Sequence, residues 1–307
     1  MAKRPPTREF FASEDHRCSS IGGQAEPPAV GQTSFVPTVL FGGCKVEPVS
    51  VEFISEGACL RGRFFAAVGT APATTLLLIP GWPGNTNDVL GLGALLADQG
   101  INVCMFNPRG LHQSEGISSP ANTLQDIRVA LQWLRQADVQ RLFEVDTTRL
   151  VLGGHSYGGG MAMAYAARDS SIRRVISIAG NDHGEFAREF QRNAAFAERI
   201  RRMLWSTRRP EGPARFDVEE GLKEFIDYQD LYGLRENAAN LADRSILLIG
   251  GWEDEEVTID QFLLPLYRAL KGAGAVKVTF LVYHTDHDFS NERRRLASDI
   301  AGWLLRN

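Results

Sequence analysis

The sequence predicts an α/β protein whose mainly parallel sheet is covered by helices on both faces. Short apolar segments alternate along the chain with amphipathic helical patterns, which is the order that βαβ units produce. One segment, residues 74–80, is almost continuously apolar, as expected of a strand buried on both faces. With 307 residues and 44% hydrophobic content, the chain can bury a large core within one domain.

Segments rich in apolar and β-branched residues, bounded by turn residues, are predicted to be strands. They are residues 49–56, 59–67, 74–80, 101–106, 148–153, 175–179, 245–249 and 276–283. The first two are expected to pair antiparallel around a turn near Gly57, and alternation with helices predicts that the others are mainly parallel. Helices are predicted at 87–99 with Thr86 as cap, from Pro120 to about 134, at 161–167, at 258–271 and at 291–305.

Residues of about 181–243 break this alternation, because they contain helical patterns without strands. A capping box at 217–220 opens the second of these helices. Because the segment leaves the sheet at the carboxyl end of the sixth strand, we expect a helical lid inserted there, above the functional site. Its arginines are interpreted as a solvated face, with an anion-recognising lid as the alternative. They are Arg188, Arg192, Arg199 and Arg202.

Residues 1–47 are expected to form a flexible N-terminal arm, and residues 48–307 the α/β domain. The arm is polar and proline-rich, and it lacks the apolar core of a secretion signal. No apolar run reaches the roughly 18 residues of a membrane helix. The net charge of −4 is spread along the chain, which argues against a nucleic-acid partner.

The four cysteines show no Cys-x-x-Cys spacing. A disulfide framework is not expected in a chain of this size, so a reducing, cytoplasmic location fits. Cys104 lies in an apolar strand and is predicted to be a small buried hydrophobic residue.

Ser156 is the serine best placed for nucleophilic chemistry. It is the centre of a Gly-x-Ser-x-Gly motif that follows a strand and precedes a strong helix former. Gly154 and Gly158 suit a tight turn in which the strand end and the helix start nearly touch. Such a turn aims the helix N-terminus at whatever the serine attacks. The context predicts a nucleophile elbow, and a purely structural glycine turn is the alternative.

A serine hydroxyl needs a base beside it, and the base needs an orienting acid. Among the six histidines, His287 follows the last strand on a loop, and its reach favours it over His284, which abuts the strand end. The cluster 284–288 also resembles a set of metal ligands, but no second cluster accompanies it, so we expect no metal.

The acid is expected at the end of the strand 245–249, where Asp254 is the preferred candidate. Glu253 in the same turn is the alternative, and Asp182 after the sixth strand is a second choice. Glu255 and Glu256 are interpreted as a solvated acidic turn. The resulting order along the chain is serine, acid, histidine.

An anionic tetrahedral intermediate needs hydrogen-bond donors that already point at it. The backbone N–H of Tyr157, at the helix start, is one expected donor. The backbone N–H of Trp82, in the Pro/Gly-rich segment 80–84, is the other, since Pro83 has none to give. The side chain of Trp82 is expected to line the acyl pocket, and a plain turn is the alternative interpretation.

With these residues assigned, the chain from about residue 50 to its end resembles the α/β-hydrolase superfamily. It is most similar to small bacterial serine esterases and to the catalytic domain of prolyl-oligopeptidase-like enzymes. The matching motifs are 154–159, 251–254, 287–289 and 107–116. In the last of these, Asn107 stands where the family usually has Asp, and His112 replaces a glycine.

The resemblance implies the α/β-hydrolase fold and a serine hydrolase that needs no metal or organic cofactor. The expected reaction is cleavage of a small-molecule carboxylic ester through an acyl-Ser156 intermediate, with His287 as base and Asp254 as its partner. A peptidase or amidase is the alternative, and a ligand-binding protein without turnover is a further one. Activity should rise with pH near the ordinary histidine pKa of about 6.5.

Overall fold

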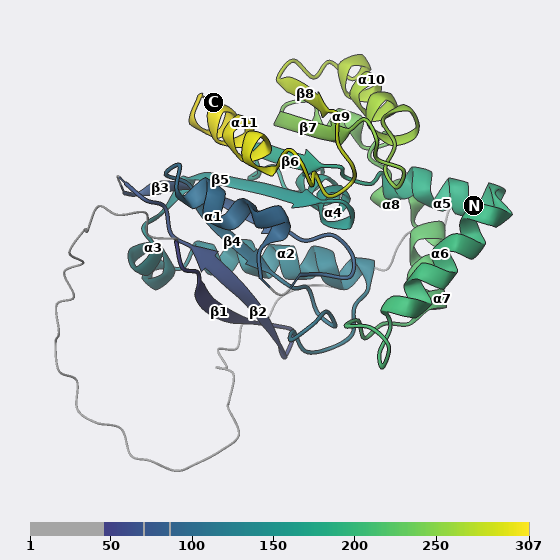
Figure 1. Ribbon diagram of the computed structural model, residues 1–307, viewed down its shortest axis with the longest axis horizontal. Coiled ribbons are helices and arrows are strands. Elements are labelled where there is room, and N and C mark those ends of the chain that lie inside the picture. Colours follow the sequence, from purple (N-terminus) through teal and green to yellow (C-terminus); the bar gives the residue numbers. More distant parts are fainter. Residues whose placement is uncertain (1–45, 70, 86, 307) are drawn as a thin grey trace, which may run out of the picture.

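The computed structural model describes residues 46–69, 71–85 and 87–306, and these form one twisted eight-stranded sheet with helices on both faces (Figure 1). The strand order is β1-β2-β4-β3-β5-β6-β7-β8. Strands β1, β2 and β4 pair antiparallel in succession, and every other neighbouring pair is parallel. The strands are β1 Val49–Ser55, β2 Ala58–Phe65, β3 Ala73–Ile79, β4 Asn102–Phe106, β5 Val145–His155, β6 Arg174–Ile178, β7 Ser245–Gly251 and β8 Val278–Tyr283.

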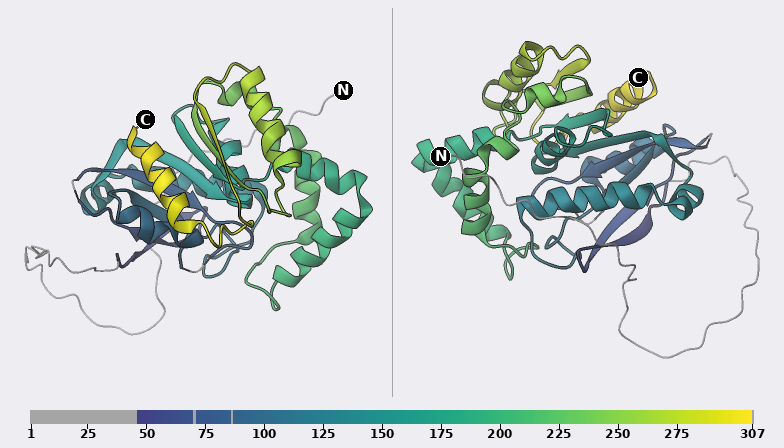
Figure 2. Two further views of the ribbon diagram at one scale, coloured as in Figure 1. Left: turned by 45° about the horizontal axis from the view of Figure 1, so that its top comes forward. Right: turned by 180° about the vertical axis from the view of Figure 1, so that it is seen from behind.

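Alternate side chains of the central strands enter two separate cores. In β3, Leu76 and Leu78 pack with α1 and α11, whereas Leu77 and Ile79 pack with α2, α4 and α10. Figure 2 shows α11, in yellow, in front of the sheet in one view and α2 across the other face in the view from behind. The helices are α1 Leu92–Ala97, α2 Pro120–Leu134, α3 Ala137–Phe143, α4 Tyr157–Ala166, α10 Leu264–Gly272 and α11 Arg293–Arg306.

The eight predicted strands and the α/β-hydrolase fold are confirmed, while several helix boundaries differ. The helix predicted at 87–99 is a 3-10 turn followed by the short α1, because Leu90 adopts a positive φ of 56°. The Asp88 carboxylate accepts the N–H groups of Gly93 and Ala94 in the first turn of α1, and the predicted cap, Thr86, lies outside the described residues. The segment predicted as one helix at 258–271 begins with a π-helical turn, and α3 was not predicted.

A helical insertion connects β6 to β7, as predicted. It holds α5 His183–Arg192, α6 Ala194–Thr207, α7 Val218–Asp227, α8 Gln229–Tyr232 and α9 Ala238–Leu241. Asn193 ends α5 and caps α6, so the first predicted helix is two helices. Asp217 caps α7 as its capping box predicts. Figures 1 and 2 show α5, α6 and α7 beyond the end of the sheet where β5 runs into α4.

The predicted arm, residues 1–47, lies outside the described residues except for its last two. Cys104 is free and fully buried, as predicted. Cys59 is disulfide-bonded, which corrects the expectation, drawn from the size of the chain, that disulfides are absent. Among the described residues, no helix combines the length and the apolar character needed to cross a membrane.

Candidate active site

Ser156 lies on the sharp turn between β5 and α4. Its backbone has φ 51° and ψ −120°, a strained combination that surrounding structure must hold. Its N–H donates to the carbonyl of Ile178 at 2.9 Å, and its carbonyl accepts from the N–H groups of Gly160 and Asn181. Hydrogen bonds to the end of β6 and the residues after it therefore fix the turn.

The two motif glycines have no room for a side chain. A Cβ on Gly154 would lie 2.3 Å from the carbonyl carbon and oxygen of Gly158, which agrees with the predicted contact of strand end and helix start. A Cβ on Gly158 would lie 2.4 Å from the carbonyl oxygens of Ile79 and Pro80. The second glycine is thus required by the neighbouring strand β3, a reason that the motif alone does not give.

Asp254 and His287, 33 positions apart, meet beyond the ends of β7 and β8. The Nδ1 of His287 and the Oδ2 of Asp254 are 2.7 Å apart, and the Asp254 side chain is fully buried. The other carboxylate oxygen accepts the backbone N–H groups of Glu256 and Val257. Because the carboxylate is held from both sides, it can orient the imidazole with its proton on Nδ1.

The electrostatic surroundings of His287 favour its protonated form. Burial lowers its pKa, but the hydrogen bond and charge of Asp254, followed by the charges of Glu256 and Asp288, outweigh burial. The pKa of His287 is therefore raised above its ordinary value. His287 is therefore expected to lose its proton at a pH above 6.5.

The far nitrogen of His287 faces a residue that the sequence did not single out. Its Nε2 lies 3.8 Å from Oε2 of Glu256, whose side chain is 67% exposed, as expected of a solvated turn. Within the described chain, the hydroxyl of Ser156 makes no hydrogen bond to His287. Hydrogen bonds between catalytic groups are often long or unmade without substrate and tighten when it binds.

The alternative acid and base residues lie elsewhere. The Nδ1 of His284 lies 3.2 Å from Oε1 of Glu253, so these two residues form a separate pair. The His284 side chain is 86% exposed to solvent. Asp182 is fully buried and binds Arg235 instead of a histidine. Its other oxygen caps α5 and accepts the N–H of Leu234, so Asp182 anchors the insertion.

A cavity of about 400 Å³ lies between the insertion and the strand ends. Ser156, Trp82 and Glu256 line it on the side of the sheet. Most of the opposite wall is apolar and comes from α5, α6 and α7. Its apolar side chains include Phe186, Phe196, Ile200, Met203, Leu204 and Phe225.

The two residues whose backbone N–H groups are the predicted oxyanion donors, Tyr157 and Trp82, both line this cavity. Tyr157 is the first residue of α4, where a helical N–H has no intrahelical partner. The Trp82 ring packs edge-on against Tyr157 at 5.9 Å, and its Nε1 donates to Thr207 Oγ1 at 2.9 Å. In the described chain, no protein group accepts the backbone N–H of Trp82. The Trp82 side chain lines the cavity, as predicted.

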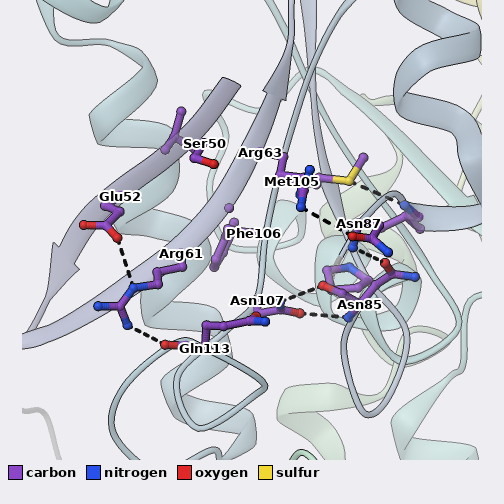
Figure 3. A pocket seen from close by; sticks show the side chains of 14 residues that line it. Ser50, Glu52, Arg61, Arg63, Asn85, Asn87, Met105, Phe106, Asn107 and Gln113 are labelled. Carbon is purple, nitrogen blue, oxygen red and sulfur yellow. Dashed lines mark hydrogen bonds and ion pairs between the residues drawn. The ribbon is translucent and has the colours of Figure 1, made fainter. Parts of the chain in front are cut away.

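Asn107 has a definite role in positioning the loop that carries Trp82. Its Oδ1 accepts the N–H of Asn85 at 2.8 Å, while its Nδ2 donates to the Asn85 carbonyl at 2.6 Å (Figure 3). An aspartate could accept but not donate, so the amide explains this departure from the family motif. The same loop borders a smaller cavity of about 190 Å³ (Figure 3).

His155, beside the nucleophile, also has a role that sequence reasoning missed. Its Nε2 lies 2.9 Å from the backbone carbonyl of His287, and the two rings are 4.8 Å apart. Burial, followed by the charge of His287, lowers the pKa of His155 to about 4, so the ring is neutral and donates to that carbonyl. His155 thereby ties the histidine loop to the elbow. Adjacency to Ser156 was the only signal in the sequence.

Comparison with known proteins gives a family match over part of the chain. Residues 74–207 match the family described as "alpha/beta hydrolase fold". The uncharacterized protein YfhR of Escherichia coli O157:H7 is 34% identical over 134 residues, which cover 41% of this chain and 45% of that protein. The chain therefore spans less than half the length of this curated relative.

Two solved structures have a similar fold. The acylaminoacyl peptidase of Pyrococcus horikoshii superposes with a TM-score of 0.63 at 20% identity, over 86% of this chain and 42% of that one. The esterase domain of a Rhodothermus marinus protein superposes with a TM-score of 0.59 at 19% identity. The match covers 85% of this chain and 98% of that domain. The family match covers less than half of the chain, and the solved structures show that the described residues have the α/β-hydrolase fold.

Proposed function

We propose that the protein is a serine hydrolase that cleaves a carboxylic ester, with Ser156 as nucleophile, His287 as base and Asp254 as its orienting acid. The observation that carries the proposal is the 2.7 Å contact between Asp254 and His287 at the sheet edge where Ser156 occupies a strained turn. A buried, doubly held carboxylate beside an imidazole is what nucleophile activation requires.

In the acylation step, His287 Nε2 takes the proton of the Ser156 hydroxyl as Oγ bonds to the ester carbonyl carbon. The electron pair of the carbonyl moves to its oxygen, which accepts the N–H groups of Tyr157 and Trp82. The intermediate then collapses, the bond to the alcohol oxygen breaks, and the imidazolium returns its proton to that oxygen. Asp254 stabilises the positive imidazolium throughout.

Deacylation repeats these steps with water. His287 takes a proton from water as its oxygen attacks the acyl carbon, and the same two N–H groups bind the new oxyanion. Breakdown of this intermediate releases the carboxylic acid and returns the proton to Ser156. All atoms come from the ester and from water, so the reaction needs no cofactor.

An amide or peptide bond is the second candidate substrate, since acylaminoacyl peptidase is among the similar folds. The two candidates differ in the leaving group, which is an amine in place of an alcohol. Paired p-nitrophenyl ester and p-nitroanilide substrates with the same acyl group separate them by the ratio of kcat/KM.

Labelling with a fluorophosphonate tests the proposal as a whole. The wild-type protein should be labelled at Ser156 and should lose esterase activity in proportion to labelling. Ser156→Ala should neither label nor hydrolyse the ester, while its circular dichroism stays unchanged. Wild-type protein that fails to label, or that hydrolyses the anilide faster than the matched ester, would contradict the proposal.

A further inference from the structure

We propose that the cavity above Ser156 receives an ester whose apolar part ends in an anionic group, and that Arg199 binds this anion. The inference rests on the proposed function, because it specifies the substrate of the same site. It is carried by the lining of the cavity and by the contacts of the arginines on α5 and α6.

The walls of the cavity favour an extended apolar group. Aromatic and aliphatic side chains of the insertion dominate the side that faces Ser156. Burying apolar substrate surface against these side chains favours binding. A small polar ester would leave much of this surface without contacts, so the fit is to a chain or ring system of moderate size.

Arg199 differs from the other arginines of α5 and α6. Each of those has a carboxylate within 4 Å, and the pairs are Arg188 with Glu185, Arg192 with Glu185, Arg201 with Glu219, and Arg202 with Glu198. In the described chain, Arg199 has no such partner, and it lines the cavity. Its guanidinium carbon lies 5.1 Å from the ring centre of Phe196, another lining residue. The aromatic ring thus holds the cation at the cavity wall.

Among the described residues that line the cavity, Arg199 is the cation without a carboxylate partner. Burial lowers the pKa of His183 to about 4, so its ring is neutral. The carboxylate of Glu256 lies beside His287, which is a cation in its protonated form. An anionic substrate group would therefore find a charge-assisted, bidentate partner in Arg199.

The position of Arg199 on α6 limits where the anion can lie. Thr207, at the other end of the lining face, contacts Trp82 next to the nucleophile. Eight residues of α-helix separate Arg199 from Thr207, a rise of about 12 Å. The structure thus favours an anion on the order of 10 Å from the reacting carbonyl, as in a monoester of a medium-chain dicarboxylic acid.

Kinetics with two matched substrates test this inference. The substrates are the p-nitrophenyl monoester of suberic acid and p-nitrophenyl octanoate, which share carbon number and leaving group. Arg199→Gln should lower the ratio of their kcat/KM values about 10–100-fold, the effect of one hydrogen bond to a charged group. Arg202→Gln, on the same helix but paired with Glu198 outside the cavity, is the control and should keep the wild-type ratio. An equal ratio in wild type and Arg199→Gln would overturn the inference.

A binding measurement separates failure of the inference from failure of the proposed function. Calorimetric titration of the Ser156→Ala protein with monoethyl suberate needs no turnover. The double variant Ser156→Ala/Arg199→Gln should bind monoethyl suberate about tenfold or more weakly than Ser156→Ala. This loss of affinity should be larger at low salt than at high salt. If the wild type neither labels nor hydrolyses esters, the proposed chemistry fails, and this titration still decides the anion site. Unchanged affinity in the Arg199→Gln protein would refute that site.

Discussion

The two walls of the cavity above Ser156 are held together in different ways. The wall at the strand ends depends on backbone contacts, such as the hydrogen bond of Ser156 to Ile178 and the close approach of Gly158 to β3. The wall formed by the insertion depends on side-chain ion pairs centred on Asp182 and Glu185. A wall fixed by backbone contacts tolerates few substitutions at the contact positions. A wall fixed by ion pairs can be altered by replacing single side chains. We therefore expect chemistry to depend on the first wall and choice of substrate on the second.

The largest effect expected at the strand-end wall is that of Asp254→Asn. The amide keeps the size of the side chain but no longer stabilises the imidazolium or selects the tautomer with a proton on Nδ1. We expect kcat for an activated ester to fall about 10⁴-fold with little change in KM. Steady-state kinetics at a pH well above the acid limb measure this loss.

Glu253→Gln is the matched control on the same turn. Glu253 is half-exposed and pairs with His284, so its loss should change kcat less than about twofold. The reverse result, with Glu253→Gln inactive and Asp254→Asn active, would assign the chemistry to the exposed pair.

Gly158→Ala should have the next largest effect, because the added methyl group must displace the end of β3 or the start of α4. Either movement shifts the N–H of Tyr157, and loss of one oxyanion donor costs on the order of 10²–10³ in kcat. Gly272→Ala, where nothing lies within 4 Å of an added Cβ, is the control and should leave kcat unchanged. A Gly158→Ala protein with wild-type kcat would show that this contact is not needed.

At the insertion, Asp182→Ala tests the ion-pair anchor. The substitution removes the acceptor for three backbone N–H groups and the partner of Arg235. We expect the free energy of unfolding in urea to fall by on the order of 3 kcal/mol, and KM to rise more than kcat falls. Asp138→Ala, which removes an exposed ion pair with Arg141, should cost less than about 1 kcal/mol.

The strand-end wall was predictable because its residues follow from local rules. A strand, a glycine-flanked serine and a helix predict the turn at Ser156, and parallel strands bring their carboxyl ends to one edge. The position of His287 beside Asp254 was expected from these rules, and its catalytic role stays a prediction. The tie between His155 and the His287 carbonyl was not predictable, since it depends on how two loops pack.

The insertion was predictable only in outline. Helical patterns and the Asp217 cap were evident, but the break at Asn193 was not, because the apolar stripe continues across it. The arginines look alike in the sequence, and their difference arises from which helix face meets the cavity. The sequence likewise did not show that Glu256, in a turn interpreted as solvated, lies near His287. Its distance from His287 is set by the fold of the acid turn around Asp254.

The smallest expected effect concerns pH and involves Glu256, which lies near His287 on the strand-end wall. Because the pKa of His287 is raised, its neutral, basic form is lost as pH falls through a value above about 6.5. The profile of kcat/KM against pH should therefore have its acid midpoint above 6.5 and a plateau on the alkaline side.

Glu256→Gln should move this midpoint to lower pH, since it removes one of the charges that stabilise the imidazolium while Asp254 remains. We expect a shift of less than about one unit, because the Glu256 side chain is 67% exposed and solvent screens its charge. The plateau rate should change little. Glu255→Gln, the adjacent exposed acid, should leave the midpoint in place. A shift to higher pH in Glu256→Gln, or equal shifts in both variants, would mean that Glu256 does not act on His287 directly.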